Sequence, residues 1–298
     1  MWRKSHSNAS RSTYAGMVAA LLAISACSAA QNSASKSEGA STKLAASNGY
    51  TLRSNVTGAS LVRLAELPST TPLPIEPESN CAHFIQPASA GGRLAARKSW
   101  RLLQEQLFYQ FQAVLIVRGG DPLTSGRCNY IDANVAFFEG ERLIGILYPK
   151  GKDGIRIAGM EVVDGHLRIW STDPSAQGQV NLKGTNLSFD EVKGSDSVCN
   201  GKFHVPVVFG QPYPQARRTL IASGWSARPS KEEMPADQIE YRRRFPELDS
   251  CAGTGYGECG FTLIAADGVT KLFITTLGGI DDMAVSSYEV ACDGKPAE

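Results

Sequence analysis

The chain has 298 residues, with 30 basic and 29 acidic side chains and a formal net charge of +1. This length suffices for one large or two small folded domains. No segment concentrates basic residues as nucleic-acid binding needs. The run Arg242–Arg244 is short, and we interpret it as part of a solvated surface. The composition therefore indicates no nucleic-acid partner.

The first 26 residues have the three parts of a bacterial export signal. Arg3, Lys4 and Arg11 form a basic start, an apolar run follows from Gly16 to Ile24, and small residues come next. The apolar run has roughly 9 residues, whereas a membrane-spanning helix needs about 20. We therefore expect the segment to be removed as a signal peptide.

The segment Leu22-Ala23-Ile24-Ser25-Ala26-Cys27 resembles the lipobox of bacterial lipoproteins, in which an aliphatic residue stands three positions before an obligatory cysteine. The resemblance implies that Cys27 is lipidated, palmitate being among its acyl chains, and becomes the mature N-terminus. It also implies three acyl chains, where a single chain would bind a membrane only marginally. Many lipoproteins that stay in the inner membrane have aspartate after the cysteine, so the resemblance implies that Ser28 at this position favours the outer membrane. The alternative is ordinary secretory cleavage that leaves Cys27 as an unpaired thiol.

Residues 27–80 are predicted to form a tether. Ser28 to Asn48 is mostly Ser, Ala, Asn, Lys and Gly, with too few apolar residues to offset the entropy of ordering. Pro68–Pro77 contains four prolines and is expected to be extended and semi-rigid. Leu61–Leu67 between them is either a short helix or a docking segment. A flexible chain from Cys27 to the folded part would have an r.m.s. reach near 40 Å.

Two modules are predicted in the folded part, which makes the fold class α+β. The first, residues 81–199, is mostly antiparallel β. Two apolar runs in Asn134–Tyr148 indicate a hairpin, and Ile155–Trp170 repeats the pattern around the turn Asp164-Gly165. Trp100–Val117 fits either a helix face or a strand, and we favour the strand.

The second module, residues 200–298, is predicted to pack one helix on a small antiparallel sheet. Pro212-Tyr213-Pro214 stands at the start of the helix Gln215–Ser223, and Gly224 at its end. Three strands are expected at Phe261–Ala265, Lys271–Thr276 and Val285–Val290, the first two joined by the turn Asp267-Gly268.

Six cysteines remain besides Cys27: Cys81, Cys128, Cys199, Cys251, Cys259 and Cys292. An even number in an exported chain indicates three disulfides, because the periplasm is oxidising. Six cysteines allow 15 pairings, and sequence does not choose among them. We expect Cys251–Cys259 within a glycine-rich loop, Cys81–Cys128 and Cys199–Cys292, so that no bridge joins the two modules. Zinc is disfavoured, because no two of these cysteines stand two to four residues apart.

Part of the second module resembles a small exported bacterial domain found in uncharacterised proteins. The resemblance is carried by Tyr213-x-x-Ala216-Arg217-x-x-Leu220-x-x-x-Gly224-Trp225, then Phe245-Pro246-Glu247, then Cys251-x-Gly253-Thr254-Gly255-x-x-x-Cys259-x-Phe261. It covers about a third of the chain and implies a domain boundary but no activity. The order of helix and sheet is also similar to that of beta-lactamase-inhibitor-like modules, by analogy of element order only.

No motif indicates a cofactor. Gly255–Gly260 matches G-x-G-x-x-G, but no clear strand precedes it and a strand pattern follows, where a dinucleotide site needs a helix N-terminus. We read it as a tight turn between bridged cysteines.

No motif indicates a metal or a catalytic residue either. His83, His166 and His204 lack ligand spacing, and Asp281-Asp282 lacks the further oxygen ligands that calcium needs. There is no G-x-S-x-G elbow, although a Ser-His-Asp triad stays open because such triads are geometric and not sequential.

These observations favour a membrane-tethered, disulfide-stabilised envelope lipoprotein with a binding, inhibitory or structural role. Its folded part would lie in the periplasm, and its partner would be another envelope protein or the cell wall. In a narrower version, the loop Cys251–Cys259 inserts into the active site of a hostile hydrolase. The alternative is an envelope hydrolase with unidentified catalytic residues. A deep pocket with converging polar groups would favour the enzyme, and a protruding rigid loop beside an exposed apolar patch would favour the binder.

Overall fold

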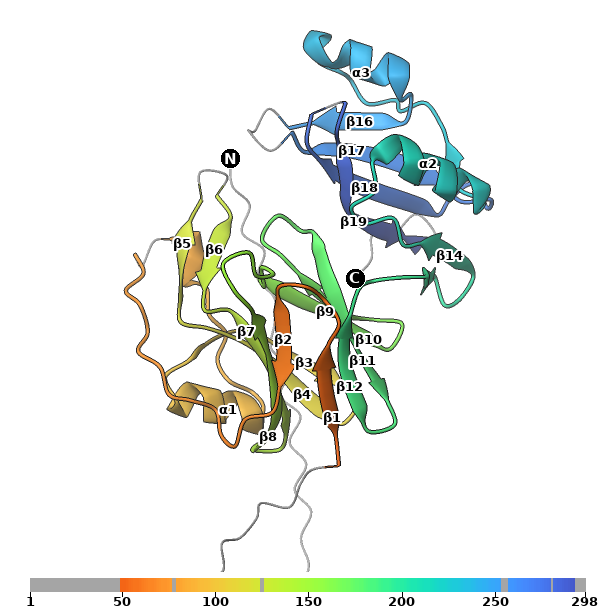
Figure 1. The fold of residues 1–298 in the computed structure, drawn as a ribbon. Coiled ribbons are helices and arrows are strands. Elements are labelled where there is room, and N and C mark those ends of the chain that lie inside the picture. The colour runs from red at the N-terminus through yellow and green to blue at the C-terminus, as the bar shows by residue number, and fades with distance from the viewer. Residues whose placement is uncertain (1–48, 77–78, 124–125, 253–256, 280, 293–298) are drawn as a thin grey trace, which may run out of the picture. The chain divides into compact units, whose positions relative to one another are not determined.

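The computed structural model describes residues 49–76, 79–123, 126–252, 257–279 and 281–292 (Figure 1). The described residues belong to one compact unit, Ala46–Glu298. They are mostly β, with several antiparallel sheets and few helices. The expected signal peptide, Cys27 and the first part of the expected tether lie outside the described residues.

Two five-stranded sheets make up the N-terminal part of the described chain. The first has the order β1-β12-β11-β10-β9, and its strands are β1 (Thr51–Ser54), β9 (Gly159–Val163), β10 (His166–Trp170), β11 (Ala176–Lys183) and β12 (Asn186–Asp190). The second has the order β2-β8-β7-β4-β3, and its strands are β2 (Ala59–Val62), β3 (Arg101–Phe108), β4 (Phe111–Val117), β7 (Asn134–Glu139) and β8 (Arg142–Pro149). Neighbouring strands are antiparallel except β1 and β12, which are parallel.

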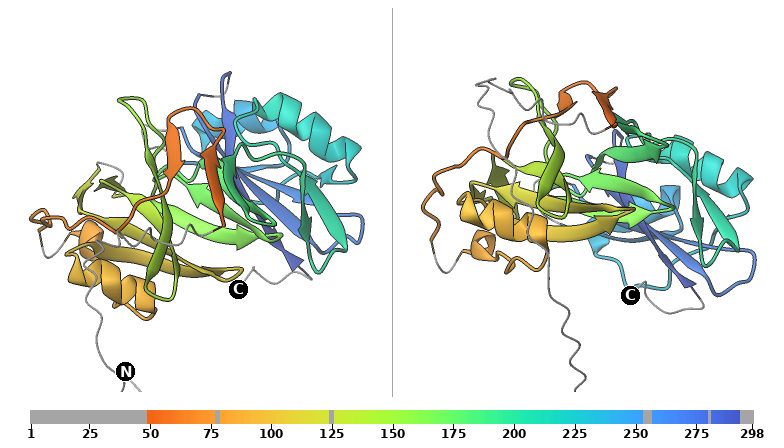
Figure 2. Two further views of the ribbon diagram at one scale, coloured as in Figure 1. Left: turned by 60° about the horizontal axis from the view of Figure 1, so that its bottom comes forward. Right: turned by 90° about the horizontal axis from the view of Figure 1, so that it is seen from below.

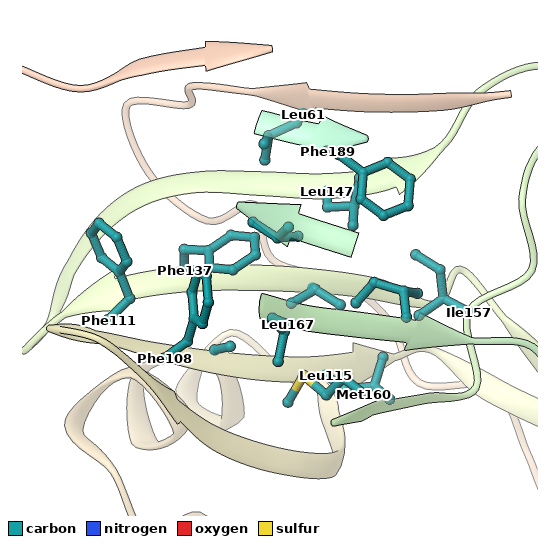
Figure 3. Packing of buried hydrophobic residues seen from close by; sticks show 14 of the residues in the cluster. Leu61, Phe108, Phe111, Leu115, Phe137, Leu147, Ile157, Met160, Leu167 and Phe189 are labelled. Carbon is teal, nitrogen blue, oxygen red and sulfur yellow. The ribbon is translucent and has the colours of Figure 1, made fainter. Parts of the chain in front are cut away.

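The two sheets face each other across one hydrophobic core. Side chains of a strand alternate between its two faces, so every second residue points into this layer. In β4, Phe111 and Leu115 belong to the core, whereas Ile116 packs on the opposite face. Phe137 of one sheet and Leu167 of the other belong to the same buried cluster (Figure 3). This is the arrangement of a β-sandwich.

A short helix covers the outer face of the second sheet. α1 (Ala90–Arg97) follows η1 (Asn80–Ala82) and contacts β3, β4 and β7 (Figure 2). Its N-terminus is capped by Ser89, whose hydroxyl accepts a hydrogen bond from the Gly92 amide at 2.8 Å. A Cβ atom on Gly91 would stand 2.5 Å from the ring of Phe138. The glycine therefore lets the helix approach the sheet closely.

The C-terminal part of the described chain has its own core. Its helices and strands are β13 (Ser195–Val198), β14 (Phe203–Pro206), α2 (Tyr213–Ala222), β15 (Ser226–Ala227), η2 (Ala236–Gln238), α3 (Ile239–Arg244), β16 (Leu248–Cys251), β17 (Cys259–Ile264), β18 (Lys271–Leu277) and β19 (Ala284–Ala291). Helix α2 buries Tyr213, Ala216 and Leu220 in a cluster with alternate residues of β17 and β18. A separate hairpin of β5 (Gly119–Pro122) and β6 (Cys128–Ile131) belongs to the N-terminal part.

Several expected elements are confirmed. Trp100–Val117 forms the strands β3 and β4, and the hairpins β7–β8 and β9–β10 lie where the apolar runs predict them. Asp164 and Gly165 both have positive φ, as a two-residue hairpin turn requires. Helix α2 begins at Tyr213, two residues before the predicted start at Gln215, with Pro212 as its N-cap. Strands β17, β18 and β19 are the three predicted strands.

Three expectations need correction. The expected tether 27–80 is wrong for residues 51–67, because β1 and β2 pair with β12 and β8 and Leu67 is fully buried. The predicted boundary near Asn200 falls inside the hairpin β13–β14, whose Val205 belongs to the C-terminal core. The described chain also contains α1 and α3 besides the one predicted helix.

No helix in the described part of the chain combines the length and the apolar character that crossing a membrane requires.

Candidate functional site

The six paired cysteines form three disulfides, in the pairs that we expected. Cys81 and Cys128 tie η1 to the β5–β6 hairpin, and Cys199 and Cys292 tie the β13–β14 turn to the end of the last strand. Cys251 and Cys259 stand opposite each other on β16 and β17, with their Cα atoms 4.0 Å apart. The spacing is shorter than the expected value of about 5.5 Å. None of these three bridges joins the two cores.

The other sequence candidates show no catalytic constellation in the described residues. His83 and His204 are exposed, and no described serine or acidic side chain forms a hydrogen bond with His166. Asp281 forms an exposed ion pair with Arg244. Within the described residues no group of three or more His, Cys, Asp or Glu side chains is arranged to hold a metal ion.

The glycine motif Gly255–Gly260 is only partly described. Residues 253–256 lie outside the described residues, while Cys259 and Gly260 begin strand β17. A dinucleotide site at this motif would need a helix N-terminus in that place.

Residues of the C-terminal sequence pattern form one buried network. The Tyr213 hydroxyl donates to Glu247 Oε1 at 2.9 Å, and Arg217 Nε donates to the same oxygen at 2.5 Å. Glu247 is fully buried. Burial, together with the charge of Glu247, raises the pKa of the Tyr213 phenol, which therefore stays a hydrogen-bond donor. The pattern Tyr-x-x-Ala-Arg with Phe-Pro-Glu thus joins α2 to the chain before β16.

A second buried network joins the two cores. Asp196 on β13 accepts two hydrogen bonds of 2.7 Å from Arg168 on β10 and one of 2.6 Å from Tyr288 on β19. Burial raises the pKa of the Tyr288 phenol, and the charge of Asp196 adds to it. A cleft of about 490 Å³ borders this network, but its central polar side chains are already bonded to one another.

A different cleft, which we name the main cleft, lies in the N-terminal part. It has a volume of about 440 Å³ and is formed where strands end and loops begin. Buried Ala133 and Ile157, which belong to the sandwich core, line it from inside. Its aromatic side chains are Trp100, Tyr130 and Tyr148, and its polar side chains include Asn129, Asp132 and Arg156.

The wall formed by residues 150–156 is held by the turn between β1 and β2. The Gly58 carbonyl accepts hydrogen bonds from the Lys150 amide at 2.8 Å and from the Ile155 amide at 3.0 Å. Gly58 has a φ of +77°, and a Cβ atom there would stand 2.9 Å from the Asp153 carbonyl oxygen. Glycine is required at this close approach.

Two further contacts fix the remaining walls. Trp100 Nε1 donates to the Pro68 carbonyl at 2.7 Å, so the proline-rich segment holds the indole. Asp132 pairs with Arg118 at 3.1 Å, and its backbone carbonyl accepts from Asn134 at 2.7 Å. Segments that the sequence presented as a tether therefore support the main cleft.

Several polar side chains of the main cleft are uncommitted, which means that they form no hydrogen bond or ion pair with another described residue. Among the described residues, no partner bonds to the hydroxyls of Tyr130 and Tyr148, the amide of Asn129 or the guanidinium of Arg156. Asn129 and Arg156 are exposed, and both tyrosines are half-buried. Burial raises the pKa of the Tyr130 phenol, so its hydroxyl is protonated at neutral pH. The cleft thus presents free donors and acceptors beside aromatic rings.

A smaller cleft of about 260 Å³, the side cleft, adjoins the main cleft. The two share Tyr130 and Thr172 in their linings. Arg127 and Trp170 line the side cleft, and Arg127 forms an ion pair of 2.7 Å with Glu258. Nη1 of Arg127 is buried and has no partner in the described part of the chain.

Sequence reasoning did not find the main cleft. Its lining comes from segments before β3, around β6, after β8 and after β10, and no motif connects them. Comparison of the chain with protein-family models, with curated proteins and with solved structures finds no match.

Proposed function

We propose that this chain is a lipid-anchored protein of the bacterial envelope that binds another envelope component through the main cleft. The cleft carries the proposal, because its aromatic rings and uncommitted polar groups line an open site without a nucleophile and base in contact. Its volume of about 440 Å³ is in the range of roughly 300–1,000 Å³ that small-molecule sites occupy.

The anchor is Cys27, with three acyl chains attached, palmitate among them, after removal of residues 1–26. Outer-membrane attachment with the folded part in the periplasm is in keeping with three disulfides, which persist in oxidising compartments. The full-length protein should enter the detergent phase on partitioning. Cys27→Ser should abolish that partitioning and leave uncleaved precursor. Wild-type protein found only in the aqueous periplasmic fraction would overturn the anchor.

Binding is tested with soluble protein that lacks residues 1–27 and with washed envelope material that combines membranes and cell wall. Wild-type protein should sediment with the material, and Arg156→Ala should weaken the association. Arg156 is exposed and bonds to no described residue, so its loss should leave stability unchanged. The matched control is Tyr109→Ala, which removes an exposed aromatic ring outside both clefts. Equal sedimentation of all three proteins would contradict a role for the cleft.

We also propose that residues 194–292 form an independently folding α+β module. They contain their own core and two disulfides, which compensate for small size. The isolated segment should give well-dispersed amide resonances under oxidising conditions. The Arg168 network crosses the boundary, so the segment should be less stable alone than within the whole chain.

A further inference from the structure

Resting on the proposed binding role, we infer that the ligand of the main cleft is a linear oligosaccharide of pyranose rings. The alternatives are a peptide, an anionic ligand such as a nucleotide, and an apolar molecule. Each of these ligands needs a lining whose polarity, charge or shape differs from that of the main and side clefts.

The lining suits a ligand with two apolar faces and a polar edge. A pyranose ring presents C–H groups on its faces, which pack on aromatic rings such as Trp100 and Tyr148. Its edge carries hydroxyls that both donate and accept hydrogen bonds. The phenol of Tyr130 and the amide of Asn129 also both donate and accept, and both are uncommitted. A purely apolar ligand would leave these groups unpaired, which is unfavourable.

The charges of the clefts favour a ligand that is neutral overall. Asp132 is paired with Arg118 and Arg127 with Glu258, so Arg156 is the one cationic side chain lining the main cleft that bonds to no described residue. A phosphate-bearing ligand usually meets several cationic or backbone N–H donors together.

The connection between the two clefts favours a chain over a single ring. The main and side clefts meet at Tyr130 and Thr172 and are lined by aromatic rings on both sides of that junction, with Trp170 in the side cleft. An extended peptide commonly adds a strand to a sheet edge, whereas these clefts are lined chiefly by loops and strand ends. A linear chain of sugar rings fits both the connected shape of the two clefts and the polarity of their lining.

The inference is tested by calorimetric titration of the soluble protein with chitotetraose and cellotetraose, with maltotetraose as an α-linked comparison. We expect saturable binding of at least one β-linked tetramer, with glucose alone much weaker. Tyr130→Phe and Arg156→Ala should each weaken it about tenfold, because each removes a hydrogen-bonding group. Tyr109→Ala should bind as the wild type does. Preference for chitotetraose would indicate an N-acetylated glycan, and preference for cellotetraose a plain glucan.

The outcomes separate this inference from the proposed function. If no tetramer binds, while sedimentation with envelope material is still weakened by Arg156→Ala, the saccharide inference is overturned and the binding role stands. If tetramers bind equally to wild type, Tyr130→Phe and Arg156→Ala, the site lies elsewhere and the inference is also wrong. If neither tetramers nor envelope material bind, both proposals fail.

Discussion

Removing the carboxylate of Asp196 should destabilise the protein more than removing any exposed charge. The side chains of Arg168 and Asp196 are 3% and 8% exposed, and the carboxylate accepts three hydrogen bonds of 2.6–2.7 Å. Burial would lower the pKa of Arg168, but the hydrogen bonds and charge of Asp196 outweigh it, and the guanidinium stays charged. Asp196→Ala therefore leaves a buried, unpaired cation.

The size of the effect follows from the surroundings of the pair. Removing one partner of a buried ion pair costs about 3–5 kcal/mol. The cleft of about 490 Å³ borders this pair, so water should reach the guanidinium once the carboxylate is removed. We therefore expect a loss near the lower limit, about 3 kcal/mol. Replacing both partners by apolar residues, as in Arg168→Met with Asp196→Leu, should recover much of this loss because no charge is left unpaired.

The assay is equilibrium unfolding in urea under non-reducing conditions, followed by tryptophan fluorescence. The midpoint should fall while the denaturant slope stays constant. Glu141→Ala is the matched control, because it breaks an ion pair with Arg97 whose side chains are 60% and 55% exposed and should change stability by less than about 1 kcal/mol. A loss below about 1 kcal/mol for Asp196→Ala, or a double variant no more stable than the single one, would refute the reasoning.

Three further predictions concern single features. Gly58→Ala should lower the free energy of unfolding by about 1–2 kcal/mol, because the φ of Gly58 is +77°. It should also weaken ligand binding by displacing residues 150–156. Unchanged binding would show that this turn does not shape the main cleft. Replacing Cys251 and Cys259 by serine should cost about 2.5 kcal/mol in the chain-entropy model, measured by urea unfolding, and an unchanged midpoint would show that the bridge is dispensable. Hydrogen bonds from Ser188, Asn55 and Asn181 outweigh burial and lower the pKa of Asp190. Its folded pKa lies below its unfolded value, so its contribution is present above about pH 4 and is lost as the pH falls further. The stability difference between wild type and Asp190→Asn should therefore shrink below that pH, and a constant difference would contradict the assignment.

The sequence predicted elements whose signals are local. The turn Asp164-Gly165 and the proline before α2 each fix the backbone within a few residues, and the structure has both. The bridge between Cys251 and Cys259 is local in the same sense, because eight positions separate the two cysteines. These features depend little on distant parts of the chain. The bridge between Cys199 and Cys292 spans 93 positions, and it was one of the pairings that the sequence left open.

The missed elements depend on distant partners. Strand β1 pairs with β12, whose first residue Asn186 lies far along the chain, and four residues of mixed polarity carry no strong strand pattern alone. Helix α1 contains Gly91 and Gly92, and glycine disfavours a helix. A larger side chain at these two positions would clash with Phe138 and Glu105. The main cleft was missed for the same reason, because its lining residues meet only after the sheets have formed.

The difference between committed and uncommitted polar groups explains why we place binding at the main cleft. At the cleft beside Arg168, a ligand would first have to break an ion pair that joins the two cores. At the main cleft the hydroxyls of Tyr130 and Tyr148 bond to no described residue. Its wall of residues 150–156 is held by two hydrogen bonds to the Gly58 carbonyl. A site shaped by the fold needs little ordering when the ligand arrives, and preorganisation of this kind favours affinity.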